Sequence, residues 1–128
     1  MVDGLGLLWG RQVTSANTSD QEGFRQTFVS ILPCVLGVTR VYADRGYRGR
    51  LAQWLIAVTG AHCLLEVIEP IEGQKGFAVQ PKRWIVERTI SWLNWSRRLS
   101  KDYEQTVASS QAWIDVSAIR GNLRKITA

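Results

Sequence analysis

Histidine and cysteine are scarce in this chain, which has one histidine, His62, and two cysteines, Cys34 and Cys63. With no second histidine and no Gly-x-Ser-x-Gly turn, a histidine-based metal site or a Ser/His triad has little support. The cysteines lie far apart and match no metal-ligand spacing, so we expect two buried, reduced thiols in a cytoplasmic protein. His62 precedes an apolar run and is expected at the edge of a strand.

Long apolar runs are absent as well. No stretch reaches the roughly 20 apolar residues that cross a bilayer, and the N-terminus has neither the basic region nor the cleavage site of a signal peptide. Hydrophobic residues make up 45% of the chain and charged residues 21%, which is typical of a globular domain rather than a disordered segment. At 128 residues we expect one domain with a modest core and no membrane partner.

Positive charge is unevenly distributed along the sequence. Residues 1–80 contain seven lysines and arginines and seven acidic residues, whereas residues 81–128 contain nine and four. The whole formal net charge of +5 therefore lies in the C-terminal third. Such an excess indicates a polyanion partner, but a solvated helical surface explains the same charge without any partner.

The spacing of apolar residues predicts strands and helices in alternation. Strands are expected over residues 7–16, 38–43 and 63–68, the first of them in a hairpin at the Asp3-Gly4 turn. Helices are expected from the capping box at Ser19 to Pro33, over residues 48–59 and 82–99, and from Ser109 or Ser110 onward. Residues 70–81 are predicted to be a loop. This order predicts an α/β domain with helices packed on a sheet.

Two of the predicted helices have distinct faces. At about 100° per residue, Glu87 shares a polar stripe with Arg83, Ser91, Asn94 and Arg98. The opposite side of that helix is expected to face the core with Ile85, Val86, Trp92, Leu93 and Leu99. The last helix is expected to bury an apolar stripe of Ala112, Val116, Ile119, Leu123 and Ile126.

Two carboxylates, those of Asp44 and Glu87, are candidate ligands for a metal ion. Asp44 follows a predicted strand and precedes a glycine, at the sheet edge where α/β proteins collect ligands. Glu87 lies in a basic, tryptophan-rich helix. Carboxylate oxygens suit Mg²⁺ or Mn²⁺, as two-metal phosphoryl transfer requires. The plainer alternatives stay open: Asp44 could begin a turn or cap the next helix, and Glu87 could pair with Arg83 or Arg88.

Several segments resemble the DDE transposases of bacterial insertion sequences. They cover nearly the whole chain: Val2–Leu7, Asn17–Asp20, Ala43–Gly49, Lys82–Thr89 and Arg97–Glu104. The most specific pieces are Asp44-x-Gly46-Tyr47 and Val86-Glu87-Arg88-Thr89. The resemblance implies a ribonuclease-H-like fold, with Mg²⁺ or Mn²⁺ as cofactor. It also implies cleavage of transposon DNA ends and joining of the 3′-hydroxyl to target DNA.

The family pattern assigns roles to individual residues. It makes Asp44 the second catalytic acid and Glu87 the third, both as metal ligands. Residues expected to contact DNA are Arg83, Arg88, Arg97, Arg98 and Lys101. Gln80 stands where the family often has Tyr, and Asn94 where a basic residue is common. Stacking on an unpaired base is conceivable for Trp84, Trp92 or Trp95, although core packing is the plainer expectation for Trp92.

The first catalytic acid of this family lies on a strand upstream of the Asp3-Gly4 turn. The resemblance therefore implies an N-terminally truncated catalytic domain over residues 1–128, inactive on its own. Asp3 belongs to the hairpin and is not expected to replace the acid. Because the missing strand is central to the sheet, we expect a homo-oligomer or association with an upstream transposase segment.

Two alternatives remain at this point. One is a non-catalytic remnant that binds nucleic acid through its basic C-terminal helices, with an affinity that falls steeply as salt rises. The other is a plain soluble α/β domain whose basic surface is incidental.

Overall fold

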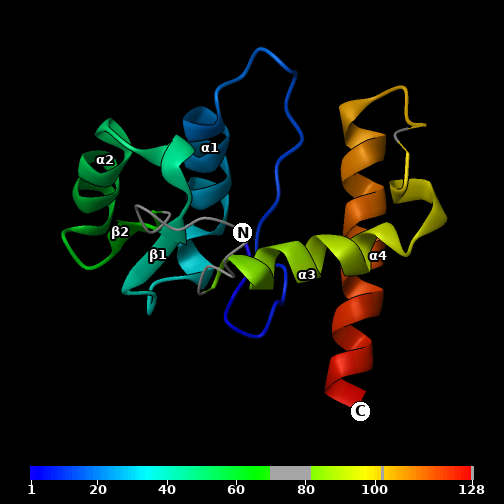
Figure 1. Ribbon diagram of the computed structural model, residues 1–128. Coiled ribbons are helices and arrows are strands. Elements are labelled where there is room, and N and C mark those ends of the chain that lie inside the picture. The colour runs from blue at the N-terminus through cyan, green and yellow to red at the C-terminus, as the bar shows by residue number, and fades with distance from the viewer. Residues whose placement is uncertain (70–81, 102, 128) are drawn as a thin grey trace, which may run out of the picture.

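The computed structural model describes residues 1–69, 82–101 and 103–127. Over these ranges it contains four α-helices: α1 (Asp20–Ile31), α2 (Arg50–Thr59), α3 (Arg83–Asn94) and α4 (Val107–Thr127). It also contains strands β1 (Arg40–Ala43) and β2 (Leu64–Val67) and short helical turns η1 (Leu32–Cys34), η2 (Arg45–Tyr47) and η3 (Arg97–Leu99). Figure 1 shows α1, α2 and both strands in one group, with α3 leading away from it to α4. This mixture agrees with the predicted α/β class.

The two strands form a parallel pair in which Arg40 lies opposite Leu64 and Ala43 opposite Val67. A parallel pair needs a crossover connection, and α2 provides it. Both strands fall inside the ranges predicted from the sequence, because β-branched and aromatic residues favour a pleated, half-buried position. The loop predicted over residues 70–81 lies outside the described residues.

The strand predicted over residues 7–16 is wrong. Within the described ranges this segment makes only one isolated bridge, between Val2 and Leu8. The tight turn between them is confirmed, since the Gly6 amide donates to the Asp3 carbonyl at 3.0 Å. A short two-stranded ribbon is marginal unless further strands or a helix cover it, so the apolar residues of this segment alone do not make residues 7–16 a strand.

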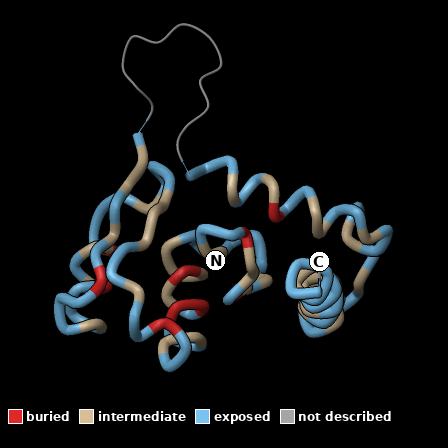
Figure 2. Tube along the Cα trace, turned by 90° about the horizontal axis from the view of Figure 1, so that it is seen from below, coloured by how far each residue is buried: buried red, intermediate tan, exposed pale blue. Residues whose placement is uncertain are grey.

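A small core joins α1, α2 and the start of β2. Its buried side chains are Phe24, Phe28, Val35, Leu51, Leu55 and Cys63. The expected α1 face is confirmed in Phe24 and Phe28, and Leu32 packs against it. Cys34 is exposed, so the expectation of two buried thiols holds only for Cys63. Figure 2 shows most buried positions in this group, one on α3 and none on α4.

The ends of α1 and α2 follow their sequence signals. The Ser19 hydroxyl accepts a hydrogen bond from the Glu22 amide at 3.3 Å, as the capping box predicts. Pro33 lies in η1, immediately after α1. Gly60 ends α2 with a left-handed backbone (φ +61°), a conformation that glycine adopts without a Cβ clash.

Helix α3 ends at Asn94 rather than near residue 99. Ser96 has an extended backbone (φ −78°, ψ 117°), which a short hydroxyl-bearing residue tolerates better than a helix former. Arg98 therefore does not belong to the polar stripe of Glu87, and Leu99 does not belong to the apolar face. Val86 is exposed rather than in the core.

The buried position of α3 is Thr89, whose hydroxyl lies 3.0 Å from both the Gly6 and the Ile85 carbonyls. This contact holds α3 against the N-terminal turn. Gly6 fits there because its φ is +81° and because an added Cβ would lie 2.9 Å from the Thr89 hydroxyl oxygen.

Helix α4 begins at Val107, before either predicted cap. The Thr106 hydroxyl accepts from the Ser109 amide at 3.2 Å, so Thr106 caps the helix. The predicted buried stripe is wrong, because its members are exposed, up to 76% at Ile126. The physical reason is position: α4 packs on α3 and η3, away from the sheet (Figures 1 and 2). None of the helices in the described ranges is both long enough and apolar enough to cross a membrane.

Candidate functional site

Asp44 directly follows β1 and continues its extended backbone (φ −82°, ψ 179°). Its Oδ1 accepts a hydrogen bond from the Gly46 amide at 3.1 Å, so it caps η2 as the plainer interpretation expected. The side chain remains exposed. The structure thus confirms the predicted place at the end of a strand and shows that one carboxylate oxygen is fixed by the following turn.

A second carboxylate, that of Asp20, lies beside Asp44. A Cβ added to Gly46 would lie 3.3 Å from Asp44 Oδ1 and 3.9 Å from Asp20 Oδ2. Burial first, and then these two acids, raise the pKa of the Tyr47 hydroxyl. Sequence reasoning missed Asp20 because the capping box after Ser19 already accounted for an acid in the first helical turn. Its nearness to Asp44 depends on how α1 meets η2.

Glu87 lies on the exposed side of α3. Arg83 Nε donates to Glu87 Oε1 at 3.0 Å, which confirms the pairing weighed as the plainer alternative. An exposed pair of this kind contributes only a few tenths of a kcal/mol. Arg88 does not pair with Glu87. Its guanidinium lies over Trp84 and Trp92, at 4.4 and 4.7 Å from the ring centroids.

The start of α3 is held against β1. Lys82 Nζ lies 3.4 Å from the centroid of the Tyr42 ring, and its interaction with the hydroxyl is the main cause that lowers the pKa of Tyr42. Alternate residues of a strand share a side, so Tyr42 and Asp44 project the same way. Glu87 follows Lys82 by five residues, a rise of about 7.5 Å along the helix.

Asp44 and Glu87 make no direct contact among the described residues. Over the same ranges, no group of three or more histidines, cysteines and acids is arranged to hold a metal ion. Both carboxylates are exposed, and their hard oxygen donors fit Mg²⁺ or Mn²⁺ rather than a soft metal.

Asp3 is fully engaged in the N-terminal turn. Burial raises the pKa of its carboxyl, but hydrogen bonds from the Leu7 amide, the Trp9 indole and the Leu5 amide outweigh it, so the pKa is lower than usual. The two amides lie at 2.9 Å and the indole at 3.1 Å. This bears out the expectation that Asp3 belongs to the hairpin.

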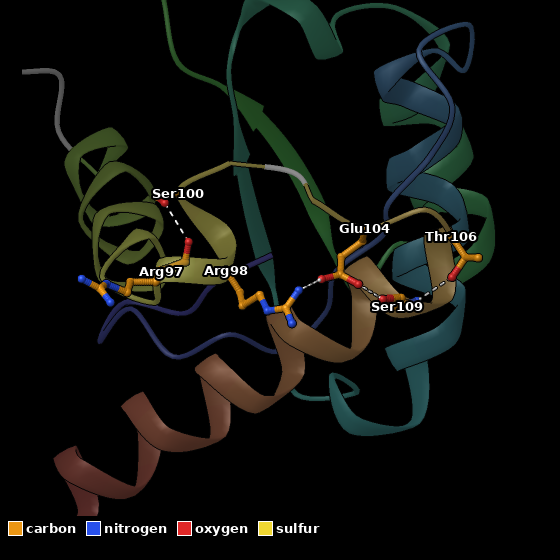
Figure 3. A network of polar contacts seen from close by, with 6 residues as sticks. All are labelled: Arg97, Arg98, Ser100, Glu104, Thr106 and Ser109. Atoms are coloured by element: carbon orange, nitrogen blue, oxygen red, sulfur yellow. Dashed lines mark hydrogen bonds and ion pairs between the residues drawn. The ribbon is translucent and has the colours of Figure 1, made fainter.

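The basic residues after α3 differ in their partners. Arg98 donates to Glu104 Oε1 at 3.2 Å, and the Glu104 side chain is only 14% exposed. Glu104 also accepts from Ser109 in the first turn of α4. Figure 3 shows Arg98 directed into this network and Arg97 directed away from it. In the part of the chain that the structure describes, Arg97 and Lys101 have no ion-pair partner.

The predicted DNA-contacting residues thus fall into two groups. Arg83, Arg88 and Arg98 are each held by a neighbour in the fold, whereas Arg97 and Lys101 present their charges to solvent. The second group is better placed to bind phosphates, since a guanidinium already paired with a carboxylate gains less from a second anion.

Comparison with curated proteins and with solved structures gave no match. A family model described as the transposase DDE domain matches residues 1–119, which is most of the chain and includes both Asp44 and Glu87. The chain therefore belongs to the transposase DDE domain family and to the machinery of DNA transposition.

Proposed function

We propose that this chain contributes Asp44 and Glu87 to the metal-holding site of a ribonuclease-H-like transposase. That enzyme cleaves DNA strands and joins the 3′-hydroxyl to target DNA. The observation that carries the proposal is the contact between Lys82 and Tyr42. It sets the start of the helix that bears Glu87 on the side of β1 from which Asp44 projects. Membership of the family supports the reaction class.

Five candidate residues have a defined role in the proposal. Asp44 presents one oxygen while the Gly46 amide fixes the other. Arg83 orients Glu87 through its hydrogen bond. Asp44 and Glu87 would hold a divalent ion, which would activate the attacking hydroxyl and stabilise the displaced oxygen. Arg97 and Lys101 bind the phosphate backbone of the DNA and position it.

A site for two metal ions needs a further acid, and Asp3 is not that acid because its carboxylate is engaged in the turn. We propose that another polypeptide segment or a partner chain supplies it. On this proposal the chain is inactive alone. Association with a segment that carries the further acid completes the site.

A second candidate function rests on the Arg83–Glu87 pair. If this pair is the only role of Glu87, the chain is a non-catalytic remnant that binds DNA through its basic C-terminal part. Such a remnant binds without sequence preference and without any need for a divalent ion.

A nicking assay tests the proposed reaction. Supercoiled plasmid is incubated with the chain alone and with the chain plus a separate transposase segment that carries the further acid. We expect nicking and strand joining by the mixture in Mg²⁺ or Mn²⁺, none in EDTA, and far less from the chain alone. Nicking that persists in EDTA, or a mixture that binds DNA and never cuts it, contradicts the proposal.

A salt titration of DNA binding separates Arg97 from Arg98. Arg97→Gln is expected to reduce the slope of log affinity against log salt by about 0.9 and to change the unfolding free energy by less than about 0.5 kcal/mol. Arg98→Gln is expected to lower the unfolding free energy by about 1 kcal/mol, because Glu104 loses a partner, and to change the slope less. The reverse pattern would contradict the assignment of Arg97 to phosphate binding.

A further inference from the structure

A pocket of about 230 Å³ lies where the end of α3 meets α4. Trp92 and Trp95 line it from α3 and the turn that follows, and Ser117, Arg120 and Arg124 line it from α4. The Ser96 and Ser117 hydroxyls are hydrogen-bonded to each other at 2.7 Å across the two elements. The pocket therefore combines aromatic rings, hydroxyls and guanidinium groups, and it lies apart from Asp44.

The charges around this pocket are positive. Arg120 and Arg124 are exposed and have no ion-pair partner among the described residues. Lys125 Nζ lies 4.0 Å from the centroid of Trp92 and donates to the Gly6 carbonyl at 3.2 Å. Burial first, and repulsion from Arg88 second, lower the pKa of Lys125, with Asp3 opposing them. An anionic ligand would relieve this accumulation of like charge.

Trp95 gives the pocket an open aromatic surface. It is 77% exposed, and no ring or cation contact to its indole occurs in the described ranges. An indole has a flat apolar face and a donor at one edge, and such groups are enriched where a partner binds. Trp92 differs, because Arg88 and Lys125 both lie over its ring.

We propose that this pocket binds a single unpaired DNA base, which stacks on Trp95 while Arg120 and Arg124 bind the adjoining phosphate. The inference rests on the proposed function only in requiring that the chain bind DNA. Ligand pockets for drug-sized molecules span about 300–1,000 Å³, so this smaller pocket admits one planar ring and no duplex. Stacking on an aromatic side chain with nearby cations is the usual way in which proteins hold single strands.

The charge distribution favours DNA over a protein partner at this site. A protein surface seated on Trp95 would have to neutralise two guanidinium groups with carboxylates, whereas a nucleotide supplies an aromatic ring and a phosphate together. The two cations and the ring lie around the same pocket, as a nucleotide requires.

The test compares two DNA duplexes in EDTA, so that no cleavage is needed. One is blunt, and the other has the same paired length plus a short single-stranded overhang that carries 2-aminopurine. We expect tighter binding of the overhang duplex and quenching of 2-aminopurine fluorescence on binding. Trp95→Ala should weaken binding of the overhang duplex by about 5- to 150-fold and abolish the quenching. Trp95→Phe should retain most of the affinity and most of the quenching.

The matched control is Trp9→Ala, which removes another partly exposed indole outside the pocket and should leave the overhang preference unchanged. Equal binding of both duplexes by the wild-type chain overturns the proposal that the pocket binds an unpaired base, while leaving the proposed transposase function intact. So does a Trp95→Ala variant that changes only the oligomeric state. Absence of binding to either duplex overturns both, and failure of plasmid nicking alone leaves the pocket standing.

Discussion

Replacing Phe28 with alanine is expected to lower the free energy of unfolding by about 3–5 kcal/mol. The Phe28 side chain is 1% exposed, stacks on Phe24 at 5.6 Å between ring centroids, and meets the edge of Trp54 at 6.1 Å. With alanine, the free energy gained by burying the ring is lost, and a cavity remains in the core formed by α1, α2 and the start of β2. Since domains of this size have a total stability of about 5–15 kcal/mol, much of the population would unfold under mild urea.

The measurement is urea denaturation followed by circular dichroism and tryptophan fluorescence. Val29→Ala is the matched control, because Val29 is the next residue of α1 and is half-exposed. Its expected change is within about 0.5 kcal/mol. Equal losses in the two variants would mean that the α1–α2 core does not hold the fold together in the way described.

The elements that were predicted correctly are determined by signals within their own residues. The Ser19 cap, the Phe24–Phe28 spacing and the left-handed Gly60 are local signals that need no distant partner. The two observed strands are short, mostly apolar and flanked by turns or helix ends, so their composition was sufficient. This is why residues 19–68 follow the sequence-based expectation closely.

The two largest errors occur where a partner decides the outcome. Residues 7–16 were predicted to form a strand, but among the described residues the segment makes a single β-bridge, to Val2. The α4 stripe has helical spacing, yet in this structure it faces solvent, because α4 contacts α3 through its other side. Hydrophobic periodicity indicates which residues share a face and does not indicate whether anything covers that face.

The candidate site was predictable only where local sequence patterns, rather than tertiary packing, determine it. Asp44 was found because a strand end before a glycine is a local pattern, and Glu87 because an acid among arginines is visible in sequence. Asp20 was not found, because only the packing of α1 on η2 brings it beside Gly46. The partner of Arg98 was also invisible, since Glu104 is selected by the bend at Ser96.

Glu87→Gln and Asp44→Asn are each expected to weaken binding of Mn²⁺ by about a hundredfold or more. Even residues that only support metal ligands cost about 10–100-fold when replaced, and an amide lacks the negative charge that a divalent cation requires. The reaction mixture that nicks plasmid should lose activity to a similar or greater extent. Binding is measured by electron paramagnetic resonance of free Mn²⁺ during titration.

Localised oxidation identifies where the ion sits. With Fe²⁺, ascorbate and peroxide, we expect backbone cleavage close to Asp44 and Glu87 that excess Mg²⁺ suppresses. Asp115→Asn is the control for charge, because Asp115 is a partly exposed acid on α4, paired with Arg11. It should leave both the affinity and the cleavage pattern unchanged. An even cleavage pattern along the chain would contradict a site at these two acids.

Arg83→Gln separates the two interpretations of Glu87. If Glu87 serves only as the partner of Arg83, removing either residue breaks the same pair, and the two variants should behave alike in stability and in Mn²⁺ binding. If Glu87 is a metal ligand, Arg83→Gln removes a competing positive charge 3.0 Å from its carboxylate, so affinity for Mn²⁺ should stay the same or rise. A loss of metal affinity in Glu87→Gln without a loss in Arg83→Gln therefore supports Glu87 as a metal ligand, and equal effects support the non-catalytic remnant.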